Sequence, residues 1–161
     1  MIRVRIIGLG SWSGDDRIGW DAVEAIEASG VLQRFPRGNV EAVRCDRPGG
    51  LLALAAGAPA LILIDAMRSG APAGTVRRLA AEELATEGAG MSSHGLGVGE
   101  SIALARALDL LPPALLVYGI EAPSSAPATE PGEQVAAAIP DVLRFLSADL
   151  AALAHADQGR P

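Results

Sequence analysis

The chain has 161 residues; half are hydrophobic, only five are aromatic, and the formal net charge is −6. This length fits one domain that can bury a core, which aliphatic side chains and alanine must fill because aromatic residues are so few. The negative charge argues against a nucleic-acid-binding protein, because phosphate binding needs clustered Lys and Arg, and the 13 basic residues form no such stripe.

Three features favour a cytoplasmic protein that binds no membrane. Cys45 is the single cysteine, so an intramolecular disulfide is excluded. The apolar run at the start of the chain is too short for a signal peptide. The longest apolar stretch, residues 51–64, contains Gly57 and Pro59 and falls short of a membrane span. The acidic, aromatic-poor composition further predicts a monomer.

Segments typical of strands and helices alternate along the chain. The first half predicts a strand over residues 2–8, a helix over 17–29, a strand over 40–45, a short helix over 49–56 and a buried strand over 60–65. The second half predicts a strand over 74–79, a helix over 100–110, a strand over 114–120, a proline-rich loop over 121–132 and a final helical stripe from 135 to 153. Pro140 should kink that stripe or divide it into two helices.

This alternation predicts the α/β fold class, as a single three-layer α/β/α domain over residues 1–154. Its sheet should be twisted and mostly parallel, with helices on both faces. Residues 155–161 are expected to form a flexible tail.

Three polar residues stand where an apolar segment gives way to a loop. Asp16 follows the first strand in GLGSWSGDDRIGW, Asp65 closes the run PALILIDA, and His94 precedes a helix in MSSHGLGVGES. Ligands of open α/β sheets bind beyond the carboxyl ends of the strands, and parallel neighbours place those ends at one edge. Two carboxylates and an imidazole at that edge would form either a metal site or an acid–base site.

Each candidate also has a structural interpretation. Asp15 and Asp16 could cap a helix or place charge at the positive end of its dipole, and His94 could be an ordinary surface residue. Asp65 is harder to explain structurally, because a carboxylate directly after four aliphatic residues is costly to bury unless it is paired. Cys45 with His94 as its base would make a thiol nucleophile, although free cysteine is more often simply buried.

Other residues near the predicted edge allow weaker hypotheses. GLGSWS resembles the start of a dinucleotide-binding loop, but Ser13 replaces the third glycine and the acidic pair would repel a pyrophosphate. Trp12 in the same loop is a candidate partner contact, whereas Trp20 is expected to pack on the following helix. Glu121 and Ser124, beyond the last strand, are further candidates for the same edge.

The segments that carry these residues resemble the hydrogenase maturation proteases, endopeptidases that trim the C-terminus of the large subunit of nickel–iron hydrogenase. The resemblance covers nearly the whole chain and rests on IIGLG…SGDDRIGWDAVEAIE, LILIDAMRSGAPAGTV, SSHGLGVGESIALARAL and LLVYGIE, in the family's order. It implies a twisted, mostly parallel sheet flanked by helices. It also implies that Asp16, Asp65 and His94 contact nickel held by the cysteines of the large-subunit precursor, so that the metal belongs to the substrate.

The resemblance further implies cleavage after a basic residue of the precursor, with release of a short peptide. Ser11 stands where the family typically has Asn, the first loop is one residue shorter, and RCDRPGG lacks the family's Gly-Gly-Thr. These departures leave Asp16, Asp65 and His94 intact and bear on the choice of substrate.

The resemblance therefore implies an endopeptidase, and we expect its hydrolytic water to be activated by the substrate-borne nickel or by a carboxylate. The protein itself is expected to be isolated without metal or with a surrogate divalent ion. A non-catalytic chaperone that binds nickel or the precursor is the alternative on the same scaffold, and a nucleotide-binding domain ranks last.

Overall fold

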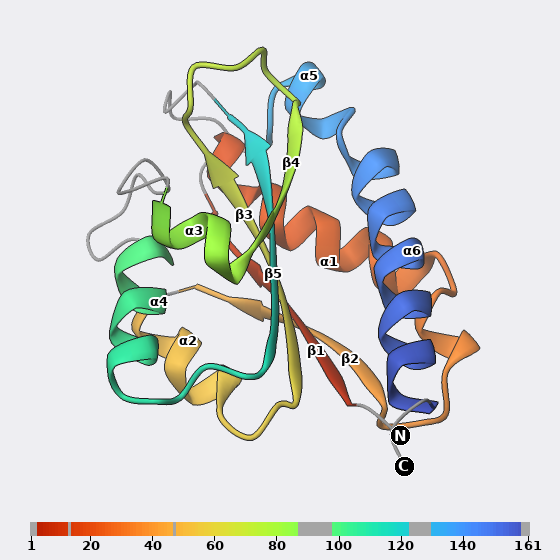
Figure 1. Cartoon of the computed structure of the whole chain (residues 1–161). Coiled ribbons are helices and arrows are strands. Elements are labelled where there is room, and N and C mark those ends of the chain that lie inside the picture. The colour runs from red at the N-terminus through yellow and green to blue at the C-terminus, as the bar shows by residue number, and fades with distance from the viewer. Residues whose placement is uncertain (1–2, 13, 47, 87–97, 123–129, 159–161) are drawn as a thin grey trace.

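The computed structural model describes residues 3–12, 14–46, 48–86, 98–122 and 130–158. A five-stranded sheet lies between two layers of helices (Figure 1). The strands are β1 (Val4–Leu9), β2 (Val40–Cys45), β3 (Ala60–Met67), β4 (Val76–Ala80) and β5 (Ala114–Glu121). The helices are α1 (Ile18–Ala28), α2 (Pro48–Ala55), α3 (Ala81–Thr86), α4 (Val98–Ala107), α5 (Glu133–Ala136) and α6 (Ile139–Gln158), with short 3-10 turns η1 (Gly14–Arg17) and η2 (Leu32–Arg34).

The sheet is mostly parallel, as predicted. Its strand order is β2-β1-β3-β5-β4, and only β4 runs antiparallel, against β5. Gly8 lies opposite Ile64, and Asp65 lies opposite Gly119. The carboxyl ends of β1, β3 and β5 therefore meet at one edge, where the loop after β1 and the end of β3 are neighbours.

Alternate side chains of the strands pack on opposite faces, as period-two alternation requires. One face packs against α1 and α6 through a cluster that includes Ile6, Ile62, Ile64, Ile18, Ile26 and Leu146. The other packs against α2 and α4 through a cluster that includes Ile7, Leu61, Leu63, Leu51 and Ile102. Residues 60–64 of β3 are fully buried, as expected of a central strand covered on both faces.

A partly buried polar network fastens α6 to the sheet. The carboxylate of Asp149 accepts hydrogen bonds from Arg78 Nε and Nη2 at 2.8 and 2.7 Å, and from the Tyr118 hydroxyl at 2.5 Å. Tyr118 is fully buried and Asp149 nearly so. Removal from water and the Asp149 carboxylate raise the pKa of Tyr118, and the hydrogen bond to Asp149 raises the pKa of Arg78. The network thus joins β4, β5 and α6 around one carboxylate.

The C-terminal part of the chain differs from the prediction in one respect. The helical stripe is divided as expected, because α5 ends at Ala136 and Pro140 lies in the first turn of α6. A proline is tolerated there because its missing N–H has no helical partner in any case. Residues 155–158, predicted to be part of a flexible tail, continue α6 as far as Gln158. In the described ranges of the chain, no helix is both long and apolar enough to cross a membrane.

Candidate active site

Two glycines bring helix α1 directly against the carboxyl ends of β1 and β3. A Cβ at Gly19 would lie 1.9 Å from the Leu9 carbonyl oxygen and 2.8 Å from that of Ile64. A Cβ at Gly8 would lie 2.2 Å from the Gly19 carbonyl oxygen. These neighbours are backbone atoms, so no rotamer change could relieve the overlap. The absence of side chains at both positions therefore lets the first turn of α1, and η1 before it, lie over the strand ends.

Asp16 and Asp65 lie close enough for their charges to interact. Asp65 directly follows the fully buried Ile64, and both aspartates are half-buried. Removal from water raises the pKa of Asp65 from 3.8 to about 8; the negative charge of Asp16 also raises it, while a hydrogen bond with the Ala66 backbone opposes the rise. The predicted juxtaposition of these two residues at the sheet edge is present in the structure.

A carboxylic acid with a pKa near 8 can hold or release a proton close to neutral pH, as a general acid or base must. Two carboxylates that repel each other also attract a cation, which would favour the charged form of Asp65. The pair can therefore serve acid–base chemistry or provide oxygen ligands to a divalent ion.

Asp15 does not cap helix α1, so the capping interpretation is wrong for this residue, although Asp15 does lie in the first turn of η1, directly before the helix. The cap residue of α1 is Arg17, which makes no side-chain cap hydrogen bond. Asp15 is buried, and its Oδ1 accepts a hydrogen bond from the Gly132 N–H at 2.8 Å. Its side chain is thus used to hold the turn that carries Asp16 against the segment before α5.

Glu121 lies at the predicted carboxyl edge of the sheet, but its side chain forms hydrogen bonds with a loop there. It is 1% exposed, at the end of β5. Its carboxylate accepts hydrogen bonds from the Ser69 N–H at 2.9 and 3.0 Å, the Ser69 hydroxyl at 2.7 Å and the Gly70 N–H at 3.0 Å. These bonds shape the loop that follows Asp65 on β3, a role with no local signal in the sequence.

The third predicted site residue, His94, lies outside the described residues, as does Ser124. Within the described ranges, no three His, Cys, Asp or Glu side chains are grouped so that they could hold a metal ion. Cys45 is buried in the cluster beneath α2, which favours its structural interpretation over that of a nucleophile.

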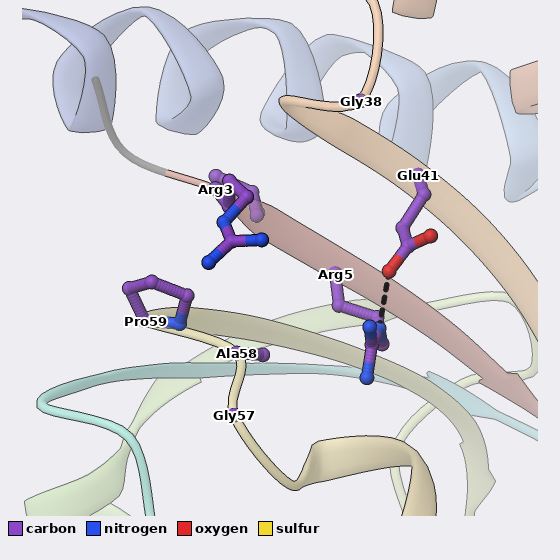
Figure 2. Close-up of a pocket in the computed structure, with 8 residues that line it drawn as sticks. Arg3, Arg5, Gly38, Glu41, Gly57, Ala58 and Pro59 are labelled. Carbon is purple, nitrogen blue, oxygen red and sulfur yellow. Dashed lines mark hydrogen bonds and ion pairs between the residues drawn. The ribbon is translucent and has the colours of Figure 1, made fainter.

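A pocket of about 180 Å³ lies at the amino ends of β1 and β3 (Figure 2), whereas Asp16 and Asp65 lie toward the carboxyl ends of these strands. Its lining includes Arg3, Arg5, Glu41 and residues 57–59. Arg5 Nε donates to Glu41 Oε1 at 2.5 Å, and Arg5 Nη1 donates to the Leu54 carbonyl. Arg5 therefore ties β1 to β2 and to the end of α2, a role within the fold.

Comparison with known proteins identifies the family. The family model of the hydrogenase maturation proteases matches residues 49–148, more than half of the chain and a range that contains Asp65. No curated protein sequence matches the chain significantly.

Solved structures support the same assignment over a longer range. The hydrogenase maturating endopeptidase HybD from E. coli is 27% identical, with a TM-score of 0.74 over 96% of this chain and 94% of that chain. The nickel–iron hydrogenase maturation protease HybD from Thermococcus kodakarensis is 26% identical, with a TM-score of 0.68 over 90% of this chain and 97% of that chain. A hydrogenase 2 maturation peptidase from Thaumarchaeota archaeon SCGC_AB-539-E09, 22% identical over 92% of this chain and 97% of that chain, shares the fold with a TM-score of 0.64. The chain therefore belongs to the hydrogenase maturation protease family.

Proposed function

We propose that this endopeptidase removes a C-terminal peptide from the nickel-loaded large-subunit precursor of a nickel–iron hydrogenase. Membership of the family places the chain among the hydrolases that cleave peptide bonds. The observation that carries the proposal is the pairing of Asp16 with Asp65 at the carboxyl edge of the sheet, where the charge of one raises the pKa of the other.

Asp16, Asp65 and His94 would recognise the nickel that the precursor carries. Carboxylate and imidazole donors suit a divalent first-row ion, although the affinity order alone does not select nickel over other metals. A cation placed between Asp16 and Asp65 offsets their repulsion and favours release of the Asp65 proton. The metal is thus part of the substrate, and its presence reports that the precursor is ready for processing.

In this proposal, the described residues hold Asp16 and Asp65 in position for hydrolysis beside the nickel. The glycine packing of α1 fixes Asp16, and the end of β3 fixes Asp65. A water molecule activated by the bound metal or by one carboxylate then attacks the peptide bond. In this proposal the protein acts as a monomer in the cytoplasm, where the precursor is its transient partner.

Mass spectrometry of a purified large-subunit precursor tests the function. The precursor is incubated with the protein in its nickel-loaded and nickel-free forms, alongside Asp65→Asn and His94→Ala. We expect loss of a C-terminal peptide only from the loaded precursor, and at least about a hundredfold slower loss with either variant. An unchanged mass with a stable complex would instead identify a binding chaperone. Wild-type processing by both variants would overturn the site assignment.

A further inference from the structure

The loop between β1 and η1 exposes a tryptophan beside the candidate site. Trp12 is 73% exposed, more than any other large hydrophobic side chain in the described part of the chain. Trp20 is only 6% exposed. Trp20 is therefore buried on its helix, as expected, and Trp12 has the exposure that a partner contact requires. A partner that covered this ring would bury a large apolar area, which is favourable.

Trp12 is held in place although it is exposed. Its ring meets that of Trp20 edge to face, with centroids 4.9 Å apart and an angle of 84° between the planes. Trp20 is itself fixed, because its Nε1 donates to the Cys45 carbonyl at 3.1 Å. The guanidinium of Arg17 lies 5.9 Å from the centroid of the Trp12 ring, and its Nε donates to Asp21 at 2.8 Å. A side chain ordered in advance loses little entropy when a partner covers it.

The position of Trp12 relative to the acidic pair follows from its contacts. Its neighbour Ser11 donates its backbone N–H to the Asp16 carbonyl at 3.2 Å, so the loop closes back on the site. Through Trp20 and Cys45, Trp12 is tied to the β2 side of the edge. Asp65 lies on β3, on the other side of β1. A peptide that follows the carboxyl edge past Asp16 and Asp65 would therefore meet the Trp12 ring on the β2 side.

We propose that Trp12 is a specificity-determining residue that packs on an apolar side chain of the precursor, on the β2 side of Asp16 and Asp65. This inference rests on the proposed function, which supplies the peptide at that edge. The exposed ring of Trp12 offers an apolar surface, whereas Arg17 already pairs with Asp21 and so contributes little free charge. Preordered tryptophans are frequent energetic centres of interfaces because they bury a large area with few rotatable bonds.

Kinetics with the nickel-loaded precursor test the proposal. Trp12→Ala should raise KM about tenfold or more with kcat little changed, since the ring contributes binding rather than chemistry. Trp12→Phe should retain most of the affinity. Leu108→Ala serves as the matched control, because Leu108 is 54% exposed just beyond α4, outside the proposed contact; its KM should equal that of the wild type. Equal thermal midpoints would show that all variants fold.

Affinity for immobilised nickel-loaded precursor gives the same comparison with little turnover when every variant also carries Asp65→Asn, which slows cleavage. The Kd should weaken about tenfold in Trp12→Ala and remain unchanged in Leu108→Ala. A Trp12→Ala variant with wild-type KM and Kd would overturn the inference while leaving the proposed function standing. Failure of the proposed function looks different, because the wild-type protein would then leave the mass of the nickel-loaded precursor unchanged, whatever residue stands at position 12.

Discussion

The Asp15 carboxylate joins the turn that carries Asp16 to the start of helix α5. Its Oδ1 accepts a hydrogen bond from the Gly132 N–H at 2.8 Å, between positions 117 residues apart. Two residues after Gly132, the carbonyl oxygen of Gln134 packs against Gly74. A Cβ at Gly74 would lie only 2.1 Å from that oxygen, so the contact requires glycine. The α5 segment is thus held both by η1 and by the loop after β3, the two segments adjoining Asp16 and Asp65.

Replacing Asp15 tests whether this bond positions Asp16. Asp15→Ala leaves the Gly132 N–H without its partner and should lower stability by about 1–2 kcal/mol. It should also lower kcat about tenfold, because small displacements of an adjacent functional group are costly. Asp15→Asn keeps an acceptor oxygen at the same place and should restore most of both losses. Urea unfolding and precursor processing measure the two effects, and equally low activity of the Asn variant would contradict a positioning role based on this hydrogen bond.

The raised pKa of Asp65 predicts how stability depends on pH in metal-free buffer. The folded protein holds this proton up to about pH 8, whereas the unfolded chain releases it near pH 4. The unfolded state therefore binds fewer protons between these values, and the free energy of unfolding should fall as pH rises through that window. The decrease contributed by Asp65 is at most about 1.4 kcal/mol per pH unit, and less in practice because the residue is half-buried.

Asp65→Asn removes the ionisation and should remove this decrease. Its stability relative to the wild type should rise from pH 5 to pH 8, as measured by urea unfolding with a chelator present. In Asp16→Asn the free energy of unfolding should still fall as pH rises, but less steeply. Removal from water raises the pKa of Asp65 more than the charge of Asp16 does, and it remains in this variant. Parallel curves for wild type and Asp65→Asn would show that Asp65 titrates normally.

Gly19→Ala should displace helix α1 from the strand ends. The added methyl group would meet the carbonyl oxygens of Leu9 and Ile64, which cannot move without disturbing β1 and β3. We expect destabilisation by about 3 kcal/mol or more and loss of processing, because Asp16 would shift away from Asp65. Gly50→Ala is the control, since among the described atoms its Cβ would meet only the Cys45 Sγ, at 3.3 Å. If Gly19→Ala and Gly50→Ala lost similar amounts of stability and activity, the effect would reflect a general intolerance of added volume and not the packing of α1 on the strand ends.

The proximity of Asp16 and Asp65 could be predicted from the sequence because local patterns determine it. A carboxylate after four aliphatic residues marks a strand end, and alternating strands and helices imply parallel neighbours whose carboxyl ends meet. The partners of Asp15 and Glu121 could not be predicted in this way, because each acts on a backbone N–H group more than 50 residues away. Helix α3 was not predicted, since its six residues are too few to show a helical period.

The hydrogen bonds of Asp149 should contribute strongly to the free energy of unfolding, because they connect strands β4 and β5 to helix α6. Asp149→Ala leaves the fully buried Tyr118 hydroxyl without its acceptor and Arg78 without its bidentate partner, so we expect a loss of about 2–4 kcal/mol. Tyr118→Phe removes one donor yet leaves the ion pair intact, and should cost about 1 kcal/mol. Both side chains belong to the network that packs against α6, so the remaining folded protein should process precursor at the wild-type kcat. Urea unfolding gives the stabilities, and a smaller loss in Asp149→Ala than in Tyr118→Phe would contradict a network centred on this carboxylate.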